Sequence, residues 1–366
     1  KEFKNPRSSY KNLKRKNNTN TCLDKTKSYQ EIKDIVDEII EDKNTDYIVK
    51  EVHKYTMTLP NDFWGPGSYD KWIRVLWALK NTHHLMINTW YLFCAQSSDF
   101  DFNCNEAIEY WNNCDIFNKE GLSYKSIIYW CKMYNFDEYT KIRKQTIDYY
   151  IHYSFRNNTE FDIATTLFHM FKSEFVCTSI KDNQWFEFKQ NKWYKIDSGN
   201  SLRLKISTQM YNEYSKKCTE FRTMNEAKYH NIALTNNNEK NEIVCDDNKE
   251  DFGDYKKKMN EMFATCKLLK RTATKNNVMR EAKELYYDGE FLNKLDKNPY
   301  LLGCNNFIID FKEKIHRKGR HDDYISKTTD INYVPLSEYQ EKEPHLINEV
   351  KDRLDEPATG LSGGQQ

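Results

Sequence analysis

One candidate pair of carboxylates for metal-assisted chemistry is Asp99 and Asp101, which are separated by a single phenylalanine. Two such side chains can hold a divalent metal ion, but a metal-dependent reaction needs further carboxylates that converge on the same ion. The sequence fixes no third carboxylate beside this pair. Aspartate is also common at caps and turns, and the neighbouring residues are aromatic, so we interpret both as loop or cap residues.

The ten cysteines are scattered along the chain and form no C-x-x-C pair. A zinc site usually contains at least one such tight pair. The best remaining combination is His83 and His84 with Cys94 and Cys104; the alternative is that the two histidines only end a helix. We therefore expect no metal in this chain. The sequence starts without a signal peptide, so reduced thiols in a cytosol-like compartment are expected.

Nucleotide-binding and metalloprotease motifs are missing from the sequence. It contains no G-x-x-x-x-G-K-[ST] phosphate loop and no H-E-x-x-H. Residues 355–366 resemble two ABC-ATPase motifs, but these overlap and stand in the reverse of the working order, so we treat this likeness as false. We expect no cofactor and no complete catalytic site in this chain.

Basic residues are the remaining candidates for a functional site. The formal net charge is +1, so a nucleic-acid site would have to be a local patch rather than a global field. A cationic helix face or strand tip can follow a phosphate backbone, and its binding then depends steeply on salt. The alternatives are a solvated face or a subunit interface. The candidate DNA-binding residues are Arg203, Lys270, Arg271, Arg280, Arg317, Lys318 and Arg320.

Three of these candidates follow a predicted pair of strands. The apolar, β-rich run Phe307–Ile309 indicates a short strand, a charged turn follows it, and Ile315-His316 predicts a return strand. The basic cluster 317–320 comes directly afterwards. The sequence therefore predicts a buried strand pair whose tip holds cations and faces a polyanion.

The rest of the second half mixes helices with strands. Alternating and helical spacings predict a helix capped by Asp162, a strand at 175–180, a hairpin of 185–188 with 192–196, and helices from Ser201 and over 259–287. The last of these helices carries Lys270, Arg271 and Arg280 on a basic side. The polar stretch 234–256 is predicted to be a mobile insertion.

The first half is dominated by helical spacing. Apolar residues recur at three and four from Tyr29 to Ile40 and from Trp72 to Leu79, which predicts amphipathic helices, the second with Ser68 as its N-cap. A short extended element is predicted at 55–59. Residues 1–30 are basic and polar and cannot bury enough surface to fold alone, so they are predicted to be a flexible tether. Contact with phosphates is the alternative for this segment.

Composition and length support two packed domains. Hydrophobic residues make up 38% of the 366 residues and aromatic residues 14%. We predict an α+β, mostly helical fold, with a helical module over 31–150 and a small α+β domain with short β-hairpins over 155–335. Residues 336–366 are predicted to be a charged lead-in with an anomalous tail. No apolar run approaches the roughly 18 residues that span a bilayer, so no membrane partner is expected.

Two stretches resemble the helicase-primases of large DNA viruses, of the poxvirus and mimivirus type. In that family a strand of the pattern asparagine-glycine, apolar, aspartate is followed by a charged turn and by aspartate-tyrosine-isoleucine-serine. These positions are Asn305–Asp310 and Asp323–Ser326 here, and Asn306 departs from the usual glycine. The resemblance covers about 161–335, the domain that precedes the helicase motor. Over 46–150 the Trp-Ile-Arg-Val helix resembles the module that follows the primase catalytic domain.

The resemblance implies the middle region of a viral replicative helicase-primase, with a post-primase module over 31–150 and a collar-like domain over 155–335. It implies DNA as a partner, self-association in a hexameric ring, and a role in ring assembly and DNA threading. ATP and Mg would serve the parent protein rather than this chain. The implied location is the viral replication site in the host cytoplasm or nucleus, and the protein is not expected to be secreted. The alternative is a stand-alone nucleic-acid-binding or oligomerisation module without enzyme activity.

Overall fold

The computed structural model describes residues 28–42, 44–98, 100, 104–113, 121–238 and 247–335. Side chains are described for these residues except 104–106, 226–238 and 247–253. Most of the predicted tether, 1–30, and the whole predicted lead-in and tail, 336–366, lie outside the described residues. Asp99 and Asp101 lie outside them as well.

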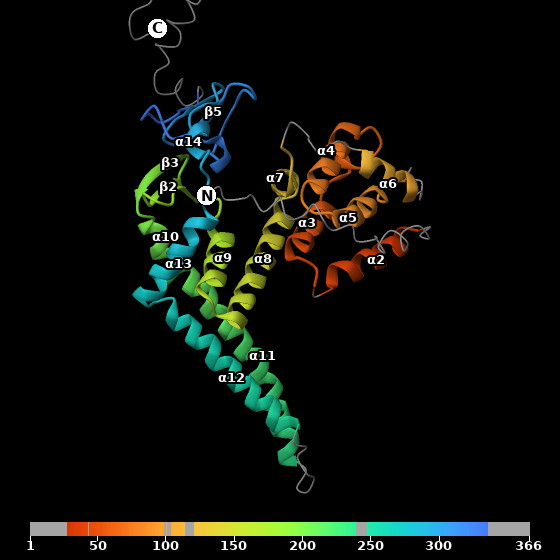
Figure 1. Ribbon diagram of the computed structural model, residues 1–366, viewed down its shortest axis with the longest axis vertical. Helices are drawn as coiled ribbons and strands as arrows, with labels where there is room; N and C mark the ends of the chain where they lie inside the picture. The colour runs from red at the N-terminus through yellow and green to blue at the C-terminus, as the bar shows by residue number, and fades with distance from the viewer. Residues whose placement is uncertain are drawn as a thin grey trace, which may run out of the picture. The chain divides into compact units, whose positions relative to one another are not determined.

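The described residues form a mostly helical α+β fold with two three-stranded antiparallel sheets, which confirms the predicted class (Figure 1). The chain divides into two compact units, 1–148 and 149–366. The boundary falls inside helix α8, Phe136–Asn157. No helix in the described ranges combines the length and the apolar character needed to cross a bilayer.

The first unit is helical in its described part. Its helices are α2 (Tyr29–Glu41), α3 (Tyr47–Met57), α4 (Tyr69–Lys80), α5 (Met86–Cys94), α6 (Cys104–Asn113) and α7 (Tyr124–Tyr134), with a 3₁₀ turn η2 (Asn61–Phe63). The apolar stripes of these helices meet in a core that contains Leu76, Trp90 and Phe93. Side chains fix where helices begin: the Ser28 hydroxyl accepts from the Glu31 backbone N–H at the start of α2.

Two local predictions in this unit need correction. The extended element predicted at 55–59 is wrong, because α3 continues through Met57. Tyr55 and Thr56 are buried in the core, and the Thr56 hydroxyl donates to the Val52 carbonyl within the helix, which satisfies it there. Ser68 does precede α4, as predicted, but its side chain makes no capping hydrogen bond.

The second unit combines helices with both sheets. After α8 come α9 (Glu160–Phe171), β1 (Phe175–Ser179), β2 (Gln184–Lys189), β3 (Lys192–Asp197), α10 (Asn200–Lys205), a π-helical turn η3 (Ile206–Met210), α11 (Tyr211–Asn238), α12 (Asp247–Leu268), α13 (Thr272–Leu285), α14 (Phe291–Lys294), β4 (Leu301–Gly303), β5 (Ile308–Asp310), β6 (Ile315–Arg317) and η4 (His321–Asp323). Helix α9 is capped by the Thr159 hydroxyl, which accepts from the Asp162 N–H, rather than by Asp162 as predicted.

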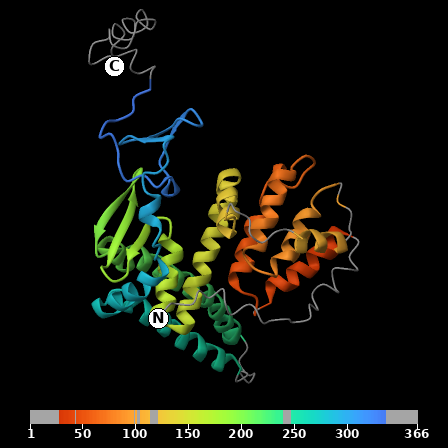
Figure 2. The same ribbon diagram turned by 45° about the horizontal axis from the view of Figure 1, so that its top comes forward.

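Both sheets are simple meanders in the order β1–β2–β3 and β4–β5–β6. Figure 2 shows the first sheet in green beside the helices of the second unit. The predicted strand and hairpin at 175–196 are confirmed, with Lys189 paired to Lys192 across a two-residue turn. The strand predicted at 307–309 and its return strand are confirmed as β5 and β6. The predicted burial of the pair is wrong for β6, because Ile315 is 50% exposed, whereas Ile308 on β5 is fully buried. An apolar cluster of Phe186, Trp193 and Phe291 joins the first sheet to α14.

Helices α11 and α12 pack against one another and change the prediction for 234–256. Helix α11 extends to Asn238 and α12 begins at Asp247, so the described parts of the predicted insertion are helical rather than irregular. The two helices meet through buried residues that include Cys218 and Cys266, whose Sγ atoms are 3.4 Å apart. Once this pairing has nucleated both helices, each further residue adds a hydrogen bond, so the helices propagate outwards.

The single helix predicted over 259–287 is also wrong, because the chain breaks between α12 and α13. Leu269 is buried at the break, and the Lys270 and Arg271 N–H groups bond three residues back, to Lys267 and Leu268. Helix α13 then turns back and packs on α9. The basic residues of this stretch therefore do not share one helix face.

We predict that Gly199→Ala destabilises the second unit more than Gly121→Ala destabilises the first. Both glycines have a left-handed φ, +66° at Gly199 and +64° at Gly121. Alanine is strained in this conformation, so either substitution should lower the unfolding free energy by about 1–2 kcal/mol. At Gly199 the added Cβ would also lie 3.1 Å from the Trp185 ring, which adds about 1–3 kcal/mol of crowding, whereas Gly121 has open space. Urea unfolding measures both losses, and equal losses would contradict the packing described here.

Candidate nucleic-acid interface

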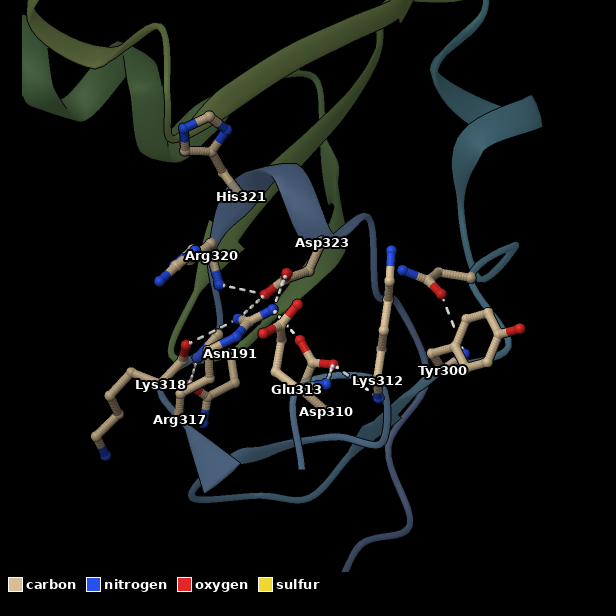
Figure 3. A network of polar contacts seen from close by, with 12 residues as sticks. Asn191, Tyr300, Asp310, Lys312, Glu313, Arg317, Lys318, Arg320, His321 and Asp323 are labelled. Carbon is tan, nitrogen blue, oxygen red and sulfur yellow. Dashed lines mark hydrogen bonds and ion pairs between the residues drawn. The ribbon is translucent and has the colours of Figure 1, made fainter. Parts of the chain in front are cut away.

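Arg317, at the end of β6, lies between two carboxylates (Figure 3). Its Nη1 and Nη2 atoms donate to the two oxygens of Asp323 at 2.8 and 2.7 Å, and Nη2 also donates to Asp310 at 3.3 Å. The side chains of Arg317, Asp310 and Asp323 are only 16%, 11% and 7% exposed. A paired fork of this kind is stronger than a single hydrogen bond, and it holds β6 to β5 and η4.

Asp310 also shapes the turn that joins β5 to β6. Its Oδ1 atom accepts from the backbone N–H groups of Lys312 and Glu313. The hydrogen bond from Glu313 holds the pKa of Asp310 below its usual value; burial opposes this effect and the Arg317 guanidinium supports it. The carboxylate is therefore ionised at neutral pH and committed to contacts within the domain.

The hairpin β2–β3 docks directly onto this network. The Gly319 N–H donates to Asn191 Oδ1, and Asn191 Nδ2 donates to the Asn305 carbonyl. The Trp193 backbone N–H donates to the Ile325 carbonyl at 2.7 Å. A Cβ atom at Gly319 would lie 2.6 Å from Asn191 Cα, so only glycine permits this approach. The β2–β3 hairpin is thus fixed to the segments around the second sheet by the Asn191 side chain and by one backbone hydrogen bond.

The residues that carry the family resemblance have structural roles in this network. Asp323 receives Arg317 and also the Arg320 backbone N–H. Ser326 donates its N–H to Asp296, whose pKa is lowered because hydrogen bonds from Ser326 and Lys327 outweigh the effect of its burial. Asn306, at the usual glycine position, is not among the described residues with positive φ and holds the Tyr333 backbone through both side-chain atoms.

The three predicted cations at this tip do not point the same way. The guanidinium of Arg317 is used inside the domain, so we leave this residue out of the proposed DNA contacts. Lys318 is exposed: its Nζ atom lies 4.6 Å from the centre of the Phe307 ring and donates to the Asn306 carbonyl. Arg320 is half-buried beside η4, and its backbone rather than its side chain bonds to Asp323.

The other four candidates come from α10, from the break before α13 and from α13 itself, and we call Arg203, Lys270, Arg271 and Arg280 the α13 surface. Arg203, on α10, donates from Nε to Asn276 Oδ1 at 3.1 Å. Asn276 and Arg280 are one helical turn apart on α13, and both are exposed. Arg271 immediately precedes the helix, and Lys270 places its ammonium 3.8 Å from the centre of the Tyr211 ring.

No metal site is found among the described residues: they contain no group of three histidine, cysteine, aspartate or glutamate side chains placed to hold an ion. His83 and His84 lie between α4 and α5, and His83 Nδ1 accepts from the Leu85 N–H. Cys94 is buried and accepts from Trp72 Nε1. The side chain of Cys104 lies outside the described residues.

The partners of Arg317 were not predicted from the sequence. The run 317–320 was predicted to be one cationic cluster, whereas strand alternation turns Arg317 inward and Lys318 outward. The signal for the inward arginine was present, because Asp310 and Asp323 are both fixed positions of the family pattern. Nothing in the local sequence pointed to Asn191, which lies over a hundred positions away and acts through turn geometry.

We predict that Arg317→Lys and Asp323→Asn each lower the unfolding free energy of the second unit by about 1.5–3 kcal/mol, the range for hydrogen bonds to charged groups that are largely buried. Lysine cannot reproduce the paired fork, so it should not rescue the loss. Lys141→Gln is the control, because its ion pair with Glu138 is exposed and screened by solvent, so its loss should change stability little. Urea unfolding measures all three, and losses no larger than the control would refute the structural role of Arg317.

We predict that Asp310 makes the second unit lose stability at acid pH. Its folded-state pKa lies below the usual 3.8, so the unfolded chain binds the proton more readily. The stabilisation is complete above that usual value and is lost as the pH falls through the lower, folded-state value. The difference in unfolding free energy between the native chain and Asp310→Asn should therefore be constant from about pH 7 to 5 and shrink below about pH 4. A difference that does not change with pH would contradict the prediction.

Comparison with known proteins identifies the family. Residues 164–354 match the family D5 N terminal like, and residues 52–131 match Primase C terminal 2 (PriCT-2). The chain is 27% identical over 276 residues to "Putative helicase L207/L206" of Acanthamoeba polyphaga mimivirus, which covers 75% of this chain and 26% of that protein. It is 26% identical over 331 residues to "Putative primase C962R" of African swine fever virus, covering 83% and 32%.

A shorter match, 37% identical over 65 residues, is to "Putative helicase 121R" of Invertebrate iridescent virus 3 and covers 18% of this chain and 7% of that protein. The chain spans about a quarter to a third of the length of the mimivirus and African swine fever virus proteins. The D5 match covers more than half of the 366 residues and includes both sheets of the second unit. The resemblance carried by Asn305–Asp310 and Asp323–Ser326 is therefore confirmed, and the chain belongs to the D5 N terminal like family.

Proposed function

We propose that this chain is the non-catalytic middle region of a viral replicative helicase-primase, where it binds DNA, supports assembly of the ring and guides DNA between primase and helicase. The observation that carries the proposal is the succession of a Primase C terminal 2 match at 52–131 and a D5 N terminal like match at 164–354 in one chain. Both a helicase and a primase appear among the names of the relatives. ATP and Mg are proposed for the parent protein, outside this chain.

The α13 surface is the proposed contact with the phosphate backbone. Arg271 and Arg280 are exposed, and Arg203 reaches the same helix through Asn276. Glu284 lies one turn beyond Arg280 on the same side of α13, so the positive charge ends there. Local positive charge suits a chain whose net charge is only +1, because it binds a polyanion without a global field.

We predict that replacing Arg271 and Arg280 by glutamine weakens binding to single-stranded DNA and flattens its salt dependence. Each lost phosphate contact lowers the slope of log affinity against log salt by about 0.7 for a single strand, so the double variant should lose about 1.4. Fluorescence anisotropy in a salt titration measures the slope. Lys181→Gln, on the exposed turn between β1 and β2, removes one charge that is not part of this surface and should leave the slope unchanged.

Light scattering on the same samples tests the ring. The proposal expects the chain to assemble as a hexamer and to bind DNA in that form. If the chain assembles but does not bind DNA, the proposal is replaced by an oligomerisation module. If a monomer binds DNA, the proposal is replaced by a nucleic-acid-binding module. In the parent protein, replacing Arg271 and Arg280 by glutamine is expected to lower DNA-stimulated ATP hydrolysis, because DNA reaches the motor less often.

A further inference from the structure

The two faces of the sheet β4–β5–β6 differ sharply in burial. Residues paired across strands share a face: Ile308 and Arg317 lie on the inner face, and the neighbouring row of Leu302, Ile309 and His316 lies on the outer face. Ile308 is fully buried, whereas Leu302 is 38% exposed. The outer face is therefore an open apolar surface within the described part of the chain.

Aromatic rings gather on this outer face. The His316 ring centre lies 5.2 Å from that of Phe307 and 4.7 Å from that of Tyr333. At the far end of β5, the Phe311 N–H donates to the Tyr300 carbonyl, and the two rings are 55% and 54% exposed. Phe307 and Tyr333 are half-buried, so the outer face combines partly covered rings at one end with exposed rings at the other. Exposed aromatic side chains on one face are typical of a binding surface.

One of these rings is held in place by Asn306, which stands where the family pattern usually has glycine. The Asn306 side chain accepts from the Tyr333 N–H at 2.7 Å and donates to the Tyr333 carbonyl at 2.8 Å. This paired contact fixes the backbone of Tyr333 against the sheet, so its ring lies beside His316. A ring that is already positioned loses little entropy when a ligand stacks on it.

The charge on this face is of one sign. Lys318 lies next to Phe307, with its Nζ atom 4.6 Å from the ring centre. None of the outer-face residues just named is acidic, and the carboxylate of Asp310 is turned to the inner face, where it pairs with Arg317 (Figure 3). The surface is therefore aromatic, apolar and cationic, which suits a ligand that carries both flat rings and negative charge.

We propose that the outer face of the sheet β4–β5–β6 binds single-stranded DNA by stacking bases on Phe307, Phe311 and their aromatic neighbours, with Lys318 against a phosphate. This inference rests on the proposed function and specifies how the strand is held. Only an unpaired strand offers its bases for stacking, because a duplex keeps them within its own stack. A second copy docked on the same face would bring two Lys318 ammonium groups together, which disfavours self-association there.

The test is the 366-residue chain carrying Phe307→Leu and Phe311→Leu. Leucine keeps the face apolar but cannot stack on a base. Affinity for a thymidine oligonucleotide of about 20 nucleotides is expected to fall about fivefold or more, the lower end for one lost stack. The variant should keep the native affinity for an abasic oligonucleotide of equal length and for duplex DNA. Its salt slope should also equal that of the native chain. Phe136→Leu is the matched control, because Phe136 is 60% exposed and belongs to the first unit, whereas both proposed surfaces belong to the second.

The outcomes separate this inference from the proposed function. Unchanged thymidine binding by the double leucine variant, with a flattened salt slope in the Arg271 and Arg280 variant, overturns the stacking surface and leaves DNA binding by the α13 surface intact. Failure of the native chain to bind any DNA overturns both. A leucine variant that changes oligomeric state but not DNA affinity assigns the face to contacts between copies and overturns the inference.

Discussion

A guanidinium enclosed by two carboxylates is the interaction on which the second unit depends. Arg317 joins β6 to Asp310 on β5 and to Asp323 on η4, and each aspartate in turn fixes a stretch of backbone. Removing the cation would leave two largely buried negative charges a short distance apart, which is far more unfavourable than losing one surface ion pair. The second sheet is very short, so these contacts supply the order that a larger apolar core would otherwise provide.

The same network shapes the proposed stacking surface. With Arg317 and Asp310 paired on the inner face, the outer row of the sheet consists of Leu302, Ile309 and His316. Lys318, the next residue along, is thereby left on the outer side beside Phe307. Two neighbouring positive residues thus serve opposite purposes, one in holding the fold and one in facing solvent, because side chains alternate along a strand.

Regular spacing in the sequence was enough to predict the fold class, the helix at Tyr29, the hairpin at 185–196 and the strand pair β5–β6. These elements follow from local periodicity, which the surrounding structure reinforces. The break at Leu269 and the helical ends of 234–256 could not be predicted in this way, because they depend on α13 packing against α9 and on α11 packing against α12. A basic run alone does not show which side chain turns inward, so the partners of Arg317 could be inferred only from Asp310 and Asp323 in the family pattern.

The π-helical turn η3 constrains the length of the chain as well as its composition. Leu202, Ile206, Met210, Tyr214 and Cys218 recur at every fourth position and are all fully buried. In a regular α-helix each such step overshoots a full turn by about 40°, so the row would wander around the helix. The slower winding of η3 takes back part of that drift and keeps the row in phase with α12. Loss of one residue from this turn would rotate everything downstream by about 100°, and a deletion here should therefore be tolerated far less well than a substitution.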